Sequence, residues 1–197
     1  MKLRRIFAIF KKQILDTSQN AGVIFSFVVF PLMTLMFVLL NSNSSEIYRM
    51  HLVMSMSTIF IGMTPFTTIN GIIREDKFSN VTRMLILSTV KPLEYLIGVT
   101  LYTMAISSVI AIVFGVIGGF VGISLLWYVL AIMLGTFTSL VFGSMLTIQT
   151  KNPSGAAAVV SLITMLNGII PTFASSSPAL MKVARFWYTT QIKDLIG

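Results

Sequence analysis

The feature that most constrains this chain is the spacing of its charged residues, which leaves four long blocks without a single charge. The blocks cover residues 17–45, 50–73, 95–150 and 152–181, and they hold 29, 24, 56 and 30 residues. An apolar run of about 18 residues or more is the sequence signal for a membrane-spanning helix. We therefore predict an all-α fold, that of a polytopic helical membrane protein.

Composition excludes the common soluble classes. Charged residues make up 10% of the chain, whereas a soluble domain carries about 25%. A soluble enzyme, a nucleic-acid-binding domain and a disordered tail are therefore excluded. The formal net charge of +8 would suggest nucleic acid in a soluble protein. Here the bases cluster at the ends of the apolar blocks, so the expected partner is the lipid bilayer and not nucleic acid.

Five spans are expected, because the block of 56 residues is too long for one helix and divides at the glycines of 118–122. Pro31 and Pro65 lie inside two spans, where neighbouring helices tolerate proline in lipid. Pro171 ends the last span. We expect a single transmembrane domain over 1–197, with an interfacial helix at 1–17, a loop at 74–94, a final segment at 174–197, and spans at 21–40, 50–73, 95–118, 125–150 and 154–173.

Orientation follows from the lysines and arginines that flank the spans, because cytoplasmic loops carry an excess of them. The flanks on one side of the membrane hold ten such bases: those before the first span, those of the loop 74–94, and Lys151. The flanks on the opposite side hold four. We therefore predict a multi-pass protein of the plasma membrane with a cytoplasmic N-terminus and with residues 174–197 outside.

Residues 2–16 have the pattern of an amphipathic helix that lies on the membrane surface. Its apolar stripe consists of Leu3, Ile6, Phe7, Phe10 and Ile14. Four bases are expected to face the lipid headgroups: Arg4, Arg5, Lys11 and Lys12. The alternative is a basic anchor without a fixed geometry.

The sequence contains no constellation of catalytic residues. No phosphate-binding loop ends in Gly-Lys-Ser or Gly-Lys-Thr, so the chain itself is not expected to hydrolyse nucleotide or to bind a cofactor. His51 is the only histidine and cysteine is absent, which excludes a multi-histidine or cysteine metal site. No Asp, Glu, Lys or Arg lies at mid-membrane depth in a predicted span, which argues against coupling to protons or ions.

Small residues recur at a spacing of four in two places. Gly135, Ser139 and Gly143 lie on one side of the fourth span, and small residues at this spacing let helices pack closely in lipid. We predict that these three residues form a helix-packing surface. The glycines between 115 and 122 show the same spacing, but there a turn between two spans is the favoured interpretation.

The loop 74–94 is the best candidate for a functional segment. Ser79 or Asn80 is a suitable cap for a short helix with Met84 and Leu85 on its apolar side, and Pro92 would end it. Such a helix either docks on a soluble partner or lies flat on the bilayer without one.

Around this loop the chain resembles the permeases of the ABC type-2 family. The resemblance is carried by Arg74 and Glu75, by the apolar segment 84–87 and by residues 91–98, and the N-terminal helix and the tail 178–197 are also similar. In that family the corresponding loop is a coupling helix that docks on an ATP-hydrolysing subunit. The resemblance therefore implies an ABC ATPase as partner, with ATP and Mg bound there, and a homodimer or heterodimer of permeases.

The residues expected to contact the ATPase are charged and apolar side chains of this loop and its flanks. They are Arg74, Glu75, Asp76, Lys77, Arg83, Met84, Leu85 and Glu94. The alternative is a solvated loop whose bases only obey the rule of positive charge inside.

The chain departs from the family pattern in two ways. The usual Ser-Pro after the coupling helix is replaced by Ser88, Thr89 and Val90. Family members generally have six spans and five are expected here, so we expect a chain that lacks the last span, either as a piece of a longer protein or as a five-span member.

The function expected on these grounds is that of a non-catalytic permease subunit of an ATP-driven ABC exporter. Its apolar composition together with the resemblance suggests a hydrophobic or amphipathic substrate, such as an antimicrobial peptide, a drug or a lipid. The alternative is a membrane protein that works without an ATPase, either a small carrier or an immunity or scaffold protein.

Overall fold

The computed structural model describes residues 3–41, 45–78, 90–149, 153–173, 181–182 and 184–196. Within these ranges the chain is helical apart from short connections and contains no strand. The helices are α1 (Leu3–Gln19), α2 (Ala21–Leu40), α3 (Glu46–Phe78), α5 (Pro92–Gly118), α6 (Ile123–Gln149), α7 (Pro153–Phe173) and α9 (Tyr188–Ile196).

Local sequence signals explain several helix ends. The side chain of Asn20 caps α2, because its Oδ1 accepts hydrogen bonds from the N–H groups of Gly22 and Val23 at 3.2 and 3.4 Å. Helix α5 begins at Pro92, whose missing N–H is not needed in a first turn. It ends at Gly118, and the next residue, Gly119, has a φ of +80°, a left-handed conformation that favours glycine.

Among the described residues, four helices are long and apolar enough to cross a membrane: α2, α3, α5 and α6. The described side chains of α7 add a shorter apolar stretch, Ala158–Phe173. Most of α3 is buried inside the bundle, whereas most of α2 is exposed, as expected for a helix with a lipid-facing surface. The prediction of a polytopic helical membrane protein is confirmed.

Helix α3 does not stop where its apolar block stops. We expected the span to end at residue 73 and a loop to begin at 74, but the helix continues to Phe78, so Arg74 and Glu75 lie on its last turns. Glu, Lys and Arg are good helix formers, and Asp76 and Lys77 find hydrogen-bond partners on other helices. The expected loop is therefore shorter, and residues 79–89 lie outside the described residues.

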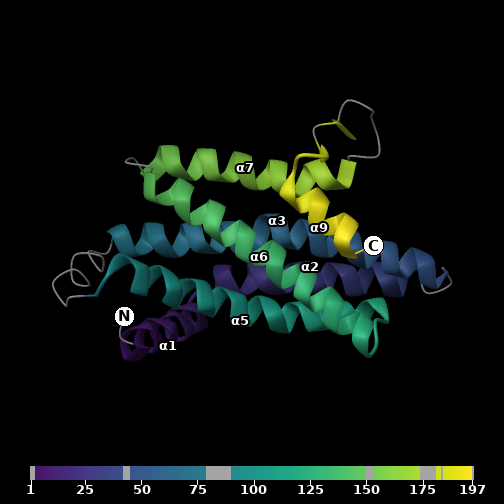
Figure 1. Cartoon of the computed structure of the whole chain (residues 1–197), viewed down its shortest axis with the longest axis horizontal. Helices are drawn as coiled ribbons and strands as arrows, with labels where there is room; N and C mark the ends of the chain where they lie inside the picture. The colour runs from purple at the N-terminus through teal and green to yellow at the C-terminus, as the bar shows by residue number, and fades with distance from the viewer. Residues whose placement is uncertain are drawn as a thin grey trace.

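Helix α3 runs through the middle of the bundle and contacts α2, α5, α6, α7 and α9 (Figure 1). Aromatic rings fill the contact between α3, α2 and α5. The ring of Phe60 lies 5.6 Å from that of Phe114 and 6.2 Å from that of Phe27, measured between ring centroids, and all three side chains are buried. These edge-on and tilted arrangements are the ones that aromatic rings prefer.

The predicted packing residues of α6 lie on its buried face against α3. A Cβ atom added to Gly135 would lie 2.8 Å from Cγ2 of Ile61, and one added to Gly143 would lie 2.6 Å from Cγ2 of Ile69. Larger residues would therefore separate α6 from α3. Of the other group, Gly115 and Gly118 lie within α5, whereas Gly119 and Gly122, both with positive φ, form the connection between α5 and α6.

Three prolines lie inside helices, Pro31, Pro65 and Pro171, and proline has no N–H for the carbonyl four positions earlier. At two of them a neighbouring helix supplies a donor. Pro65 leaves the carbonyl of Ile61, which accepts a hydrogen bond from Ser139 Oγ of α6 at 2.7 Å. Pro171 leaves the carbonyl of Asn167, which accepts one from Thr189 Oγ1 of α9 at 3.1 Å. Hydroxyl groups of neighbouring helices therefore complete the backbone hydrogen bonding of α3 and α7.

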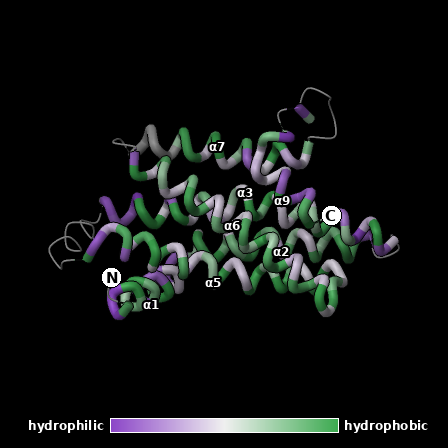
Figure 2. The backbone as a smooth tube through the Cα atoms, viewed as in Figure 1, coloured by the Kyte–Doolittle hydropathy of each residue, from purple (hydrophilic) through white to green (hydrophobic). Residues whose placement is uncertain are grey.

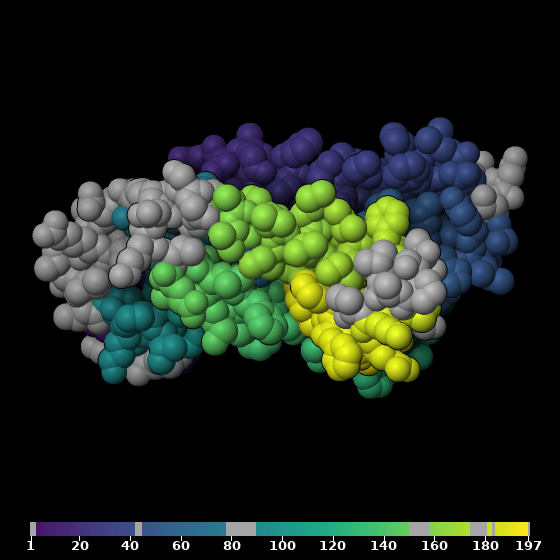
Figure 3. Space-filling model, turned by 90° about the horizontal axis from the view of Figure 1, so that it is seen from above, coloured from purple at the N-terminus to yellow at the C-terminus, as the bar shows by residue number. Residues whose placement is uncertain are grey.

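The C-terminal residues pack into the bundle. Helix α9 contacts α6, α3 and α7, and Figure 3 shows it beside α7. Trp187 Nε1 donates to Asn167 Oδ1 at 2.8 Å, the hydroxyls of Tyr188 and Ser139 lie 2.9 Å apart, and Lys193 Nζ donates to the carbonyl of Pro171 at 3.2 Å. The described helix of the expected outer segment 174–197 therefore packs against three other helices, as the similarity of the tail to the family pattern allows.

Replacing Thr189 by valine should destabilise the protein, because the carbonyl of Asn167 then loses its donor in a buried position. We expect a loss of about 1–2 kcal/mol. Thr190→Val is the matched control, since Thr190 Oγ1 has no hydrogen-bond partner among the described residues. In a Pro171→Ala background the loss should shrink, because the new backbone N–H can serve the carbonyl of Asn167. Thermal unfolding of the purified variants in detergent measures each value; equal losses for the two threonines would contradict the assignment.

Candidate functional site

The predicted functional loop lies at one end of the bundle, which we call the α1 end. Figure 1 places α1 there, together with the C-terminal end of α3, the N-terminal end of α5 and the C-terminal end of α6. Figure 2 shows hydrophilic residues gathered on α1 and on the adjoining ends of α3 and α5, with hydrophobic residues along the helices between. The charged side chains of three helices therefore meet at the α1 end.

We use the word junction for the cluster formed by Arg5, Lys12, Asp76, Glu94 and Tyr95 at the α1 end. Asp76 lies at its centre, although only 4% of its surface is exposed. Lys12 Nζ of α1 donates to Asp76 Oδ1 at 2.9 Å, and the hydroxyl of Tyr95 of α5 donates to Asp76 Oδ2 at 2.6 Å. Hydrogen bonds to a charged group are worth about 1.5–3 kcal/mol each. One carboxylate thus joins the last turns of α3 to α1 and to α5.

Lys12 binds two carboxylates. Its Nζ lies 2.9 Å from Asp76 Oδ1 and 2.8 Å from Asp16 Oδ2, one helical turn further along α1. Burial alone would lower the pKa of Lys12, but the hydrogen bonds and charges of Asp16 and Asp76 outweigh it, so this pKa stands above its usual value. Lys12 therefore stays protonated at physiological pH and keeps both interactions.

A second ion pair joins α1 to the first turn of α5. Arg5 Nη1 lies 3.6 Å from Glu94 Oε2, and Glu94 is only 1% exposed. The same oxygen of Glu94 accepts a hydrogen bond from the backbone N–H of Lys91 at 3.3 Å, which satisfies a donor at the start of α5. Glu94 therefore both caps its own helix and holds the beginning of α1.

Apolar contact brings α1 close to α5 between these charged pairs. Ile6 and Ile9 are buried, and a Cβ atom added to Gly98 would lie 2.8 Å from two side-chain atoms of Ile9. The predicted stripe is therefore split: Ile6 is buried and Phe10 is half-buried, whereas Leu3, Phe7 and Ile14 are exposed. Helix α1 thus has one face on the protein and another apolar face open to lipid.

Lys77 joins α3 to a fourth helix. Its Nζ donates to the carbonyls of Thr147 and Ile148 at 3.0 and 3.4 Å, at the C-terminal end of α6. The last turn of a helix leaves carbonyls that need donors from outside it, and a cation near them is favoured by the helix dipole. Close by, Thr147 Oγ1 donates to Asn70 Oδ1 of α3 at 3.1 Å.

The predicted contact residues therefore fall into three groups. Asp76, Lys77 and Glu94 bind other helices of this chain, and the carboxylates of Asp76 and Glu94 are buried. Arg74 is half-buried and Glu75 is exposed on α3. The remaining three lie outside the described residues: Arg83, Met84 and Leu85.

Sequence reasoning missed the partners of these acids. Arg5, Lys12 and Tyr95 were assigned to lipid headgroups or to a span, and not to the junction. One signal was present, since Arg5 and Lys12 are seven residues apart and so lie on one side of a helix, opposite the exposed side of Phe7. Two bases on the side of α1 that faces the protein need two acidic partners elsewhere in the chain.

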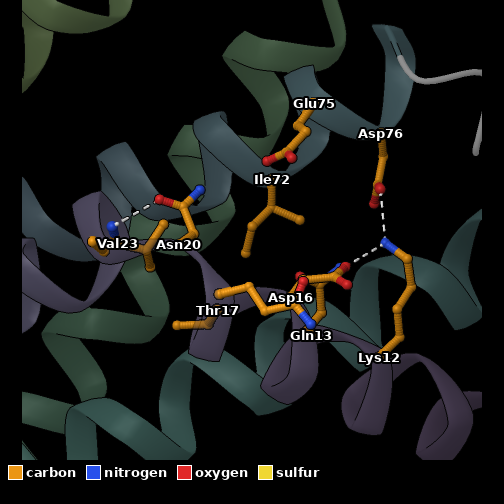
Figure 4. A pocket seen from close by; sticks show the side chains of 11 residues that line it. Lys12, Gln13, Asp16, Thr17, Asn20, Val23, Ile72, Glu75 and Asp76 are labelled. Carbon is orange, nitrogen blue, oxygen red and sulfur yellow. Dashed lines mark hydrogen bonds and ion pairs between the residues drawn. The ribbon is translucent and has the colours of Figure 1, made fainter.

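Beside the junction lies a hollow of about 450 Å³ between α1, the start of α2 and the last turns of α3. Figure 4 shows the charged side chains of Lys12, Asp16, Glu75 and Asp76 around it. The full lining consists of Lys12, Gln13, Asp16, Thr17, Gln19, Asn20, Ala21, Val23, Ile72, Glu75 and Asp76. In the part of the chain that the structure describes, no group of three or more metal-ligating side chains comes together.

This arrangement defines a multi-pass membrane protein with a charged junction at one end. Its sequence matches the family model of the ABC-2 type transporter over residues 4–188. The chain therefore belongs to the ABC-2 type transporter family, which confirms the resemblance seen around the loop 74–94. Neither the comparison with curated proteins nor that with solved structures finds a match.

Membership of this family makes the chain an ABC-type permease, a transport component of the membrane that is generally non-catalytic. The junction then has a clear position in the molecule. It lies at the facing ends of α3 and α5, the two helices between which the predicted coupling segment runs.

The link between α1 and α3 can be tested by removing its two partners singly and together. Lys12→Met should cost about 1–3 kcal/mol, with the lower part of this range favoured because 35% of the Lys12 side chain is exposed and screened by water. Adding Asp76→Asn should cost less than the sum of the single losses, because the variants remove the same bond. Unfolding of the purified chain in detergent provides the three values.

Lys11→Met serves as the control, since Lys11 is the exposed neighbour of Lys12 and surface substitutions usually stay within about 0.5 kcal/mol. A loss for Lys12→Met no larger than that for Lys11→Met would show that the junction does not hold α1.

Proposed function

We propose that the chain is the permease subunit of an ATP-driven exporter that moves a hydrophobic or amphipathic substrate, such as an antimicrobial peptide, a drug or a lipid, out of the cell. The match to the ABC-2 type transporter family carries this proposal. The absence of a phosphate-binding loop motif from the sequence agrees with it, since the ATP would be hydrolysed by a separate ABC ATPase subunit, which would hold ATP and Mg.

The segment around 79–89 is our candidate for the contact with that ATPase. It follows α3 directly and leads into α5, and the junction binds the ends of both helices to α1. A ligand shifts a conformational equilibrium only through different affinities for the two states. If the ATPase binds this segment differently in its two states, the displacement reaches α1, α3 and α5 together.

The structure changes the assignment of roles within the predicted contact set. We assign Asp76, Lys77 and Glu94 to positioning, because each binds another helix of the chain. Arg83, Met84 and Leu85, with Arg74 and Glu75 beside them, remain the contact candidates. The permease would work as a homodimer or heterodimer with two ATPase subunits.

Purification of the tagged chain from its own host in mild detergent tests the partner. We expect an ATPase that carries a phosphate-binding loop to be recovered with it, and we expect Arg83→Glu combined with Met84→Asp to reduce its recovery about tenfold or more, because both changes fall on the docking segment. Arg185→Glu, an exposed base in the C-terminal part of the chain, is the matched control. Recovery of the wild-type chain without any ATPase would favour the carrier, immunity or scaffold alternative.

We also propose that the chain lies in the plasma membrane with its N-terminus in the cytoplasm. The chain contains no cysteine, so single cysteines can be introduced without background labelling. Ser18→Cys on α1 should react with a membrane-impermeant maleimide only after the cells are permeabilised. Glu46→Cys, at the opposite end of the bundle and with a 94% exposed side chain, should react in intact cells. The reverse labelling pattern would overturn the orientation.

A further inference from the structure

The outer surface of α1 carries two bases that neither the junction nor the coupling segment uses. Arg5 and Lys12 bind carboxylates of other helices. Arg4 and Lys11 are exposed, and among the described residues neither forms an ion pair. The structure therefore divides the bases expected to face lipid headgroups into an inner pair and an outer pair, and the outer pair is Arg4 with Lys11.

The outer pair points away from the rest of the protein. Arg4 and Lys11 are seven residues apart, so they lie on one side of the helix, about 10 Å apart along its axis. The side of α1 that is buried against the bundle consists of Ile6, Ile9 and Gln13. Residues two positions apart, such as Ile9 and Lys11, point about 160° apart around a helix axis. The outer pair is thus nearly opposite the face that α1 turns to the protein.

Large apolar side chains lie exposed on both sides of the outer pair. Leu3 and Phe7 are 83% and 70% exposed and lie with exposed Ile14 on one side, and Leu15 lies exposed on the other. Bases beside an apolar surface are typical of a helix that inserts at the boundary between headgroups and acyl chains. The long stems of arginine and lysine lie along the apolar surface there, while their charges reach the headgroups.

The position of α1 in the chain decides what covers this surface. Only Asn20 separates α1 from α2, a span that is itself mostly exposed. Figure 3 shows α1 and α2 in purple along one edge of the molecule. The outer surface of α1 therefore meets the lipids of the leaflet in which α2 begins. The sole acid of α1, Asp16, is bound by Lys12.

We propose that the outer pair binds the phosphates of anionic phospholipids, with Leu3 and Phe7 in the adjoining acyl region. Both bases attract a headgroup that has a net negative charge, and the guanidinium of Arg4 can bind two phosphate oxygens at once. The surface of α1 would thus prefer anionic to zwitterionic lipid. The inference concerns the chain and its lipids, so it stands whether or not the chain works with an ATPase.

A fluorophore on α1 reports which lipids surround it. Ala8 is exposed and lies within about one turn of both Arg4 and Lys11, and the chain contains no cysteine of its own. The full chain with Ala8→Cys is labelled with bimane and placed in vesicles of phosphatidylcholine. These vesicles contain a small, equal fraction of either phosphatidylglycerol or phosphatidylcholine that carries a quenching nitroxide on its acyl chain. We expect quenching that corresponds to enrichment of phosphatidylglycerol at this position by about fivefold or more.

Two double variants assign the preference to the outer pair. Arg4→Gln with Lys11→Gln, made in the labelled chain, should reduce the enrichment about fivefold, because both attractive charges are removed. Lys182→Gln with Arg185→Gln is the matched control, since it removes two exposed bases from the C-terminal part of the chain and changes the net charge equally. The control should keep the enrichment.

Three outcomes would overturn the proposal. The first is equal quenching by the two nitroxide lipids in the labelled chain without further substitution, a comparison that does not depend on the folding of any double variant. The second is the same enrichment for both double variants. The third is the absence of quenching by either lipid, which would show that protein, such as a second copy of the chain, covers this surface instead.

Discussion

Every backbone carbonyl inside a bilayer needs a hydrogen-bond donor, because hydrocarbon offers none. Prolines inside α3 and α7 break that condition locally, and in both cases a neighbouring helix supplies the missing donor. Ser139 of α6 donates a hydrogen bond to the carbonyl that Pro65 leaves without a donor. Thr189 of α9 donates one to the carbonyl that Pro171 leaves without a donor. Helices that supply hydrogen-bond donors to one another cannot slide or rotate independently. The fold therefore depends on pairs formed by a proline in one helix and a hydroxyl in another.

A different interaction holds the α1 end. There the structure buries charge, and buried charge is tolerated only with partners. Asp76 and Glu94 each have them, from the surface helix α1 and from α5. The bundle is thus held by neutral hydrogen bonds within the apolar region and by ion pairs at the end that carries most of the bases. The ion pairs respond to solution conditions and to binding partners more readily than the neutral hydrogen bonds do.

The helical membrane fold and the family were predictable from the sequence, because the spacing of charges and the loop pattern are local features. The partners of Asp76 were not, since Lys12 lies 64 positions earlier and a single sequence does not record which distant residues meet. The end of α3 was misplaced for a related reason. Arg74 and Glu75 mark the end of an apolar block, but both are good helix formers, so the end of the block need not be the end of the helix. The contacts of α9 with Asn167 and Pro171 were not predictable either, because these residues belong to another helix and give no local signal.

The unbroken course of α3 has a mechanical consequence. Its 33 residues at 1.5 Å each give a rod of about 50 Å, whereas the hydrocarbon core of a bilayer is about 30 Å thick. The rod must therefore tilt, protrude or do both. Because the bundle surrounds its middle and the junction holds its last turns, a rotation of about 10° around the midpoint would carry each tip about 4 Å in opposite directions. A small displacement at one surface of the membrane would thus appear at the other without any change in the helix itself.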